Sequence, residues 1–220
     1  NIPVLNPSGV QEILDFGLHG WAMSRYSGAW VALKVTAETT DVAASVDLDP
    51  ERVQVRIPTD FDMPAGGLSI RLPASPLAGP QALEQELRLH KHKLAAAVAY
   101  ARANHLDRVV SDGPGRRFGI VTCGKSYLDV QQALEDLGLE EAELRRLGVA
   151  IYKVGLTWPM EPQGARRFAE GLAEVLVVEE KRALVENQLK QMLYDLPDAQ
   201  RPRIIGKFDD AGEWILPSAD

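Results

Sequence analysis

The sequence contains a single cysteine, Cys123, among its 220 residues. One thiol excludes a disulfide within the chain, and it excludes a four-cysteine zinc site or an iron–sulfur cluster built from this chain alone. Long apolar runs are absent as well, since none approaches the ~18 residues that a membrane-spanning helix needs. We therefore expect a protein that does not bind a membrane and that resides in the cytoplasm.

Positive charge is also scarce, with 24 lysines and arginines against 31 acidic residues and a formal net charge of −7. An acidic surface repels phosphate backbones, so the composition disfavours nucleic acid as a partner. The four histidines lack the spacing and the nearby acids of a metal site, and we expect none. What is present is ordinary globular composition, 45% hydrophobic and 25% charged, in a length that suits one large domain or two small ones.

The first 35 residues predict a strand, a helix and a second strand. The chain begins at Asn1, without methionine, in a segment that already has the character of a strand, so we expect a piece of a longer polypeptide. Ser8 and Gln11 have the spacing of a capping box, and apolar residues then recur at helical period. Residues 30–35 follow as a mostly apolar run. A strand–helix–strand order predicts parallel strands.

The character of the chain changes after this unit. Residues 53–57 and 68–72 alternate strictly between apolar and polar side chains, with prolines and glycines between them. Strict alternation is typical of half-buried strands with one face in water. We therefore predict a small antiparallel β excursion over residues 43–73.

A long helix is predicted over residues 81–104. Its apolar side chains fall on one stripe that includes His90 and Leu94, and we expect this stripe to be buried between the two halves of the chain. Residues 108–117 contain Gly-Pro-Gly and are predicted to form a connector that leads into the second half.

The last hundred residues alternate regularly between strands and helices. The predicted strands are 118–122, 149–154, 175–178 and 203–206, and the predicted helices are 126–137, 140–147, 161–171 and 181–193. This alternation predicts an open parallel α/β sheet with right-handed crossovers and with helices on both faces.

The best candidate site lies where the first of these strands ends. Open parallel sheets bind ligands at the carboxyl ends of their strands. Here Gly124, Lys125 and Ser126 form a glycine loop before a helix, where free amides and a lysine attract an anion. The loop lacks the known phosphate-binding motifs, so a plain strand-to-helix turn is favoured over a site. Cys123 is a candidate nucleophile, although a small buried thiol is the favoured interpretation.

Three further positions carry suggestive residues. Trp158, with the following proline, either walls a pocket or packs a loop. Glu179 and Glu180 are adjacent acids that could hold a cofactor, pair with Arg203 or Lys207, or cap the next helix. Capping is the favoured interpretation, because the dipole of a helix favours acids at its N-terminus. Arg25 is the best polar candidate near the N-terminus. No triad, metal cluster or Gly-Asp-Gly motif with a downstream Asn accompanies them.

Several stretches resemble bacterial indolepyruvate ferredoxin oxidoreductases, a family of 2-oxoacid:ferredoxin oxidoreductases. The matching stretches are residues 3–12, 17–28, 118–122, 124–130, 153–159, 177–182 and 206–209, in chain order, with the weakest region at 36–115. Cys123 departs from the family pattern, in which a small residue such as threonine is expected.

The resemblance implies an anatomy for the chain. Residues 1–75 would be the end of a thiamine pyrimidine-type domain with the β excursion, and 76–115 a connector with the long helix. Residues 116–208 would be a transketolase C-terminal-like, Rossmann-like domain, and 209–220 a tail. The second domain would mostly build a homodimer and frame the active-site entrance.

The resemblance also implies a reaction for the parent protein. The parent would decarboxylate aryl-pyruvates oxidatively to acyl-coenzyme A with thiamine diphosphate, Mg and 4Fe-4S clusters, and pass electrons to ferredoxin. The fragment itself would bind none of these cofactors and would be inactive alone, its partners being the remaining domains of the parent. Two alternatives stay open, which are a stand-alone α/β interaction or regulatory module and a component of another thiamine-dependent 2-oxoacid dehydrogenase.

Overall fold

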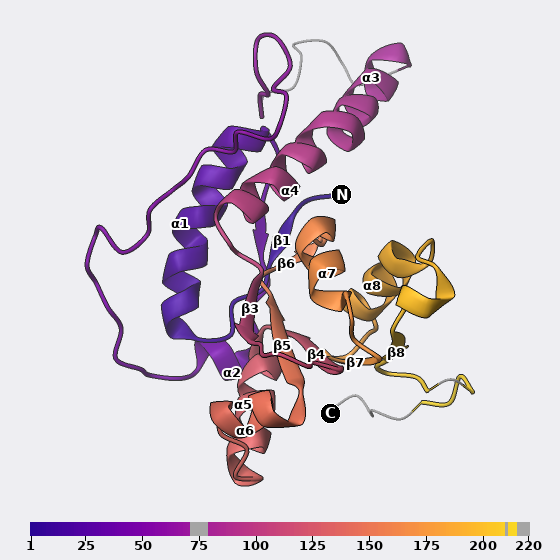
Figure 1. The fold of residues 1–220 in the computed structure, drawn as a ribbon. Helices are drawn as coiled ribbons and strands as arrows, with labels where there is room; N and C mark the ends of the chain where they lie inside the picture. Colours follow the sequence, from indigo (N-terminus) through magenta and orange to yellow (C-terminus); the bar gives the residue numbers. More distant parts are fainter. Residues whose placement is uncertain (71–78, 210, 215–220) are drawn as a thin grey trace.

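The computed structural model describes residues 1–70, 79–209 and 211–214. Its strands form two sheets, a small one near the N-terminus and a larger one from the second half of the chain (Figure 1). The small sheet has the order β2 (Ala32–Leu33), β1 (Val4–Leu5), β6 (Leu156–Trp158). The large sheet has the order β3 (Arg108–Ser111), β5 (Val149–Val154), β4 (Phe118–Cys123), β7 (Glu174–Val178), β8 (Arg203–Ile205).

The predicted parallel sheet of the second half is confirmed. β4 pairs in parallel with β5 and with β7, and β7 pairs in parallel with β8. The interpretation of residues 108–117 as a connector is wrong in part, because β3 adds to the edge of the sheet antiparallel to β5. Four residues carry too little periodicity to reveal a strand, and its pairing with the exposed edge of β5 is decided by the tertiary fold.

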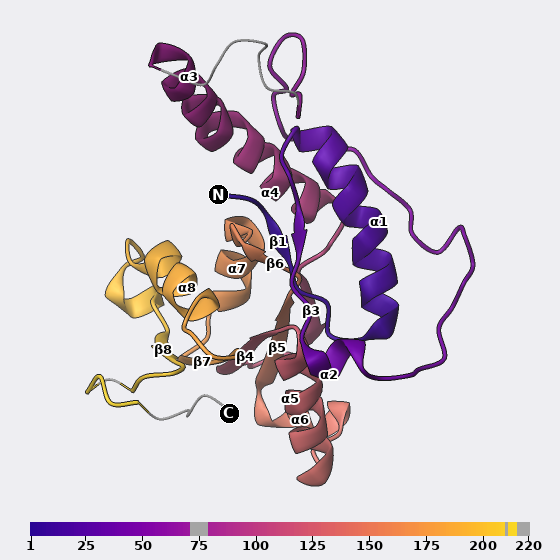
Figure 2. The same ribbon diagram turned by 180° about the vertical axis from the view of Figure 1, so that it is seen from behind.

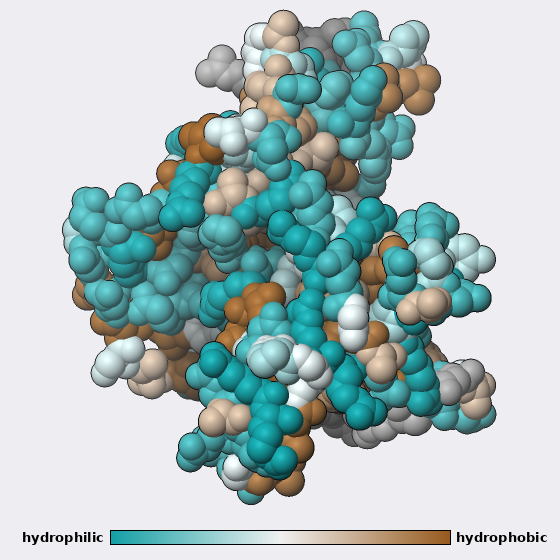
Figure 3. Space-filling model, viewed as in Figure 1, coloured by the Kyte–Doolittle hydropathy of each residue, from teal (hydrophilic) through white to brown (hydrophobic). Residues whose placement is uncertain are grey.

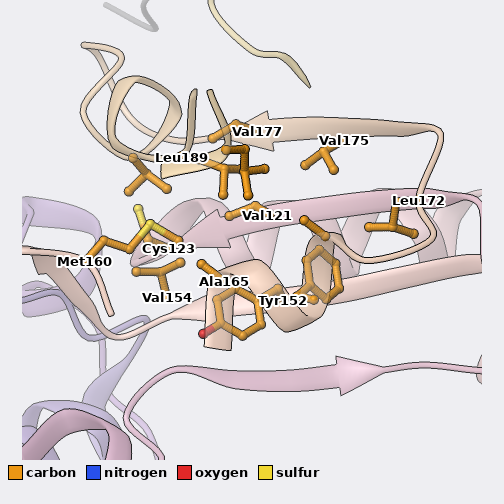
Figure 4. Packing of buried hydrophobic residues seen from close by; sticks show 14 of the residues in the cluster. Val121, Cys123, Tyr152, Val154, Met160, Ala165, Leu172, Val175, Val177 and Leu189 are labelled. Atoms are coloured by element: carbon orange, nitrogen blue, oxygen red, sulfur yellow. The ribbon is translucent and has the colours of Figure 1, made fainter. Parts of the chain in front are cut away.

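Helices cover both faces of the large sheet, as predicted. α5 (Lys125–Asp136) and α6 (Glu141–Leu147) lie on one face, and α7 (Pro162–Ala169) and α8 (Val185–Leu193) lie on the other (Figure 1). The larger core cluster packs β4, β5 and β7 against α7 and α8, and Figure 4 shows its side chains interdigitating. A smaller cluster beneath α5 and α6 includes Val130 and Leu144.

Local sequence explains where these helices begin and end. α6 is followed by Gly148 at φ +73°, a left-handed conformation that favours glycine and terminates the helix. α7 begins at Pro162, whose missing N–H costs nothing in the first turn. The carboxylate of Glu161 accepts hydrogen bonds from the amides of Gln163 and Gly164, so the start of α7 is fixed by its own sequence.

The predicted βαβ unit at the N-terminus is present, with β1 and β2 parallel and joined by α1 (Val10–Ser27). The capping differs from the expectation, since Gly9 precedes α1 and provides no side-chain cap. Ser8 instead donates its amide and its hydroxyl to the carboxylate of Glu12, at 2.8 and 2.9 Å. β2 is also shorter than the apolar run of residues 30–35 suggested.

The predicted antiparallel excursion is wrong for the residues that the structure describes. Residues 53–57 and 68–70 are not strands, and 71–73 lie outside the described residues. The described part runs along the outside of α1 after the short helix α2 (Ala37–Thr40) (Figure 2). Asn104 bonds the amide and carbonyl of Arg56 through its side chain, and this contact takes the place of a strand partner.

The predicted long helix is continuous but only half buried. It consists of α3 (Pro80–Arg88), a π-helical turn (Leu89–Lys93) and α4 (Leu94–Ala103). α4 packs on α1, and Tyr100 lies in a core cluster with Leu5. His90 is exposed, so its predicted burial is wrong, because α3 extends away from the two sheets (Figure 1).

The two halves of the chain are joined by strand pairing and by buried polar contacts. β6, from the second half, pairs with β1, and the amide of Asn6 donates to the carbonyl of Gly155 at 2.9 Å. The ammonium of Lys153, which is 1% exposed, donates to Ser8 and Glu12. The division into domains at residues 75, 115 and 208 stays a prediction.

Candidate functional site

The carboxyl ends of β4 and β7 open onto a cavity of about 530 Å³. Four separate segments line it, namely residues 34–38, 125–129 in part, 179–181 and Lys207. A second cavity of about 320 Å³ lies beside it, sharing Lys34 and residues 179–181 and adding Asn6, Cys123 and Arg182. The structure therefore places polar groups at the sheet edge where parallel α/β folds bind ligands.

The glycine loop of the sequence analysis lies in this edge. Gly124 has φ +53°, and a Cβ there would collide with the side chain of Asn6, so both the backbone and the packing require glycine. α5 begins without a side-chain cap, and the amides of Lys125 and Ser126 have no partner among the described residues. Ser126 is itself buried. The edge thus presents unpaired amide donors.

The charged candidates of the loop are ion-paired. The Lys125 ammonium lies 2.6 Å from the Asp129 carboxylate one turn along α5, and this hydrogen bond raises the pKa of Lys125. Glu180 pairs with Lys34 at 3.2 Å. Neither of the possible partners considered for it, Arg203 and Lys207, forms an ion pair with it within the described residues, and Arg203 pairs with Glu174 on β7.

Glu179 caps the next helix, as the sequence favoured. Its two carboxylate oxygens accept the amides of Leu184, Val185 and Glu186 at 3.0, 2.9 and 2.9 Å. Burial raises the pKa of Glu179, and the three amides work against that rise. This acid is therefore used by the fold and is not free to bind a ligand.

Cys123 is a buried thiol. Its side chain points into the larger core cluster, beside Met160 and Val154 (Figure 4). The side-chain amide nitrogen of Asn6 lies 3.7 Å from its sulfur. Burial raises the pKa of the thiol to about 12, so Cys123 is protonated at neutral pH and is no nucleophile.

The other two candidates lie elsewhere. The Arg25 guanidinium stacks on the exposed ring of Trp21, 4.0 Å from its centroid, at an apolar groove of about 800 Å³ between α1 and β2. Trp158 ends β6 beside Val4 and does not line the cavity at the sheet edge. The structure thus brings together Lys125, Ser126 and Glu180, next to Gly124, but neither Arg25 nor Trp158.

Sequence reasoning did not propose several residues of this edge as ligand-binding groups, although it named Lys207 as a possible partner of Glu180. Lys34 follows the short strand β2, Lys181 has φ +59°, and Lys207 follows β8. Lys207 directly follows the predicted strand over residues 203–206, and this position was a usable signal, since the ends of parallel strands meet at one edge. The side-chain conformations and the approach of residues 34–38 could not be read from the pattern.

A second polar cluster lies near the start of β3. The Oδ1 atom of Asp107 accepts the amides of Gly155 and Leu156, both at 2.8 Å, while its buried Oδ2 atom has no partner. Burial raises the pKa of Asp107 to about 7. Asp107 lines a cavity of about 780 Å³ that Arg102, Tyr152 and other residues also line. Nothing in the sequence pattern marked Asp107.

The described residues do not fit a metal cofactor. No group of three or more histidine, cysteine or acidic side chains comes together anywhere in residues 1–70, 79–209 or 211–214. The one cysteine cannot supply the roughly four thiolates of an iron–sulfur cluster. In the same part of the chain, no helix is both long and apolar enough to cross a membrane.

Curated relatives of this chain are subunits of indolepyruvate oxidoreductases. It is 27% identical over 188 residues to the indolepyruvate oxidoreductase subunit IorA of Methanothermobacter thermautotrophicus, covering 86% of this chain and 28% of the relative. It is 29% identical over 203 residues to IorA of Pyrococcus abyssi, covering 89% of this chain and 28% of the relative. The chain thus spans well under half of these relatives.

A solved structure also matches, a 2-oxoglutarate:ferredoxin oxidoreductase from Magnetococcus marinus. It is 14% identical, with a TM-score of 0.46, and the match covers 93% of this chain and 38% of that one. The family model described as the indolepyruvate ferredoxin oxidoreductase middle domain matches residues 107–219, which is more than half of the chain. This chain therefore belongs to the family of the indolepyruvate ferredoxin oxidoreductase middle domain.

Proposed function

We propose that this chain is a structural part of a 2-oxoacid:ferredoxin oxidoreductase that acts on indolepyruvate and related aryl-pyruvates. The family match over residues 107–219 is the observation that carries this proposal. The parent enzyme would decarboxylate its substrate oxidatively to the acyl-coenzyme A, with ferredoxin as electron acceptor. The large parallel sheet would support the assembly while other parts of the parent perform the chemistry.

The parent's cofactors would be held outside these residues. Thiamine diphosphate supplies an electron sink for decarboxylation, and iron–sulfur clusters carry electrons singly. Two features of the sequence support this placement, namely a single cysteine where a cluster needs roughly four and the lack of a Gly-Asp-Gly motif with a downstream Asn. The curated relatives are long enough to hold these groups elsewhere, since this chain covers only 28% of them.

An exposed apolar surface on the N-terminal half supports a role in assembly. Trp21 and Trp30 are 65% and 72% exposed beside the groove between α1 and β2. Large exposed apolar surfaces mark interaction sites in soluble proteins. We assign this groove to contact with the remaining domains of the parent, and we assign dimer formation to the same assembly, which would reside in the cytoplasm.

The experiment compares the full-length parent with the 220-residue chain. Indolepyruvate-dependent reduction of ferredoxin, with coenzyme A present, is expected for the parent and not for the chain. Calorimetric titration of the chain with thiamine diphosphate and magnesium is expected to show no saturable binding in the micromolar range. Such binding would place the cofactor site inside these residues, and a parent active only on other 2-oxoacids would refute the substrate class.

A further inference from the structure

Three cations at the sheet edge form no hydrogen bond or ion pair with the described residues. They are Lys181, Arg182 and Lys207, and they line the two adjoining cavities at the ends of β4 and β7. No hydrogen bond or ion pair of their side chains is formed within the part of the chain that the structure describes. Unpaired cations gathered at one edge are unexpected in a chain with a net charge of −7.

The acids of the same cavity are already occupied, with one exception. Glu180 pairs with Lys34, Asp129 pairs with Lys125, and Glu179 accepts three amides of α8. Among the described acids that line this cavity, Glu38 on α2 is the one without a hydrogen bond to a cation, although Lys125 and Lys181 lie near enough to lower its pKa. The unpaired cations therefore outnumber the unpaired carboxylates at this edge.

Lys207 is the most unusual of these cations. It is only 5% exposed, although lysine is rarely buried without a paired acid. Its backbone amide donates to Glu186 at 2.8 Å, but the Glu186 carboxylate already holds Lys190. The Lys207 ammonium is not among the fully buried polar atoms that lack a hydrogen-bond partner. Because the residue lines the cavity, we infer that its charge faces that space.

Two features of the backbone support the same site. α5 has 12 residues and begins at this cavity with the unpaired amides of Lys125 and Ser126, which attract anions. Lys181 adopts a left-handed conformation that a lysine rarely adopts, and such strain is concentrated at functional sites. This edge therefore offers converging donors.

We propose that this edge binds the phosphate group of a phosphorylated small molecule. Lys207 and Lys181 supply the charge, and the first amides of α5 supply fixed hydrogen-bond donors. A tetrahedral phosphate with a charge near −2 suits several donors that approach from different segments, because each of its oxygens accepts separately. The proposal does not depend on the proposed function, since it rests on this chain's own residues.

The test is a titration of the 220-residue chain with inorganic phosphate, free of magnesium and at constant ionic strength, followed by calorimetry or NMR. Saturable binding with a Kd of about 1 mM is expected, which corresponds to roughly −4 kcal/mol. Lys207→Met should weaken binding at least about tenfold. Lys181→Asn should weaken it several-fold, because asparagine tolerates the left-handed conformation without the charge.

The control variant is Lys91→Met, which removes an exposed lysine on the projecting long helix and should leave phosphate binding unchanged. Acetate is titrated in parallel to represent a carboxylate ligand. Equal affinity for acetate would overturn the phosphate assignment. Absence of saturable phosphate binding would overturn the site. Wild-type affinity in the Lys181→Asn variant would also overturn it, and this result remains informative if Lys207→Met fails to fold.

Discussion

The ionisation of Asp107 should make the stability of the protein depend on pH. Its pKa is raised to about 7 by burial, from an ordinary value of 3.8. Between these two values the folded state retains a proton that the unfolded state has lost. The free energy of unfolding should therefore fall as pH rises from about 4 to about 7, by up to ~1.4 kcal/mol per pH unit from this group.

The variant Asp107→Asn should remove this slope. Asparagine keeps an oxygen that accepts the amides of Gly155 and Leu156, but it carries no charge. The free energy of unfolding of the variant should therefore fall less between pH 5 and pH 8 than that of the wild type. Urea denaturation at both pH values measures the difference. Asp195→Asn, at an exposed position, is the control and should keep the wild-type pH dependence. An unchanged slope in Asp107→Asn would contradict the assignment.

At the scale of single elements, the long helix is unevenly supported. Leu83 and Leu87 on α3 are 68% and 61% exposed, whereas Leu94, at the start of α4, is 8% exposed. Figure 3 shows hydrophobic side chains on the surface around α3. Arg88 and Lys93 donate hydrogen bonds to the backbone carbonyls of Gly67 and Ser69. α3 nevertheless buries little apolar surface.

Two matched substitutions measure this difference. Leu94→Ala should lower the free energy of unfolding by roughly 2–5 kcal/mol, because it opens a cavity in packed surroundings. Leu87→Ala should change it by less than about 0.5 kcal/mol, because the side chain is in water. Urea denaturation at low protein concentration compares them. A similar loss in both variants would show that α3 is packed in solution, against a second copy or another segment.

At the scale of the whole molecule, a buried ion pair connects the two halves. Lys153 on β5 binds Glu12 on α1, and Arg108 reaches the same carboxylate at 3.1 Å. Burial lowers the pKa of Lys153, while Glu12 opposes the shift. Removal of one partner leaves the other charge buried and uncompensated, which is costly.

Glu12→Ala should therefore lower the free energy of unfolding by roughly 3–5 kcal/mol. The double variant Glu12→Ala with Lys153→Met should recover most of this loss, because no buried charge then remains. Glu141→Ala, which breaks an exposed pair with Arg145, should cost less than about 1 kcal/mol. Equal stability of Glu12→Ala and the double variant would contradict the cost assigned to the uncompensated Lys153 charge, and wild-type stability of Glu12→Ala would show that the two halves do not depend on this contact.

The second half of the chain was predictable because its local signals agree. The strand over residues 149–154 and the helix stops at Gly138 and Gly148 follow from hydrophobic runs and from left-handed glycines. Parallel pairing follows from the alternation of strands and helices. The same reasoning located the loop at Gly124, because ligand sites lie at strand ends in such sheets.

The alternating pattern at residues 53–57 led to a wrong prediction. Alternation produces a strand only where a second strand is available for pairing. Here the side chain of Asn104 bonds the backbone of Arg56 instead. The burial of His90 failed because the helix extends beyond the core that it was expected to cover.

The sequence by itself determined the α/β class, the alternation of strands and helices over residues 118–206 and the family, because these depend on local periodicity, capping residues and matching stretches of chain. Only the tertiary structure decided which charges are paired and which are free. Lys34, Lys125 and Lys207 look alike in the sequence, yet within the described part of the chain the first two have carboxylate partners and the third does not. The physical reason is that an ion pair depends on distances of a few ångströms between segments far apart in the chain, and local patterns do not encode such distances.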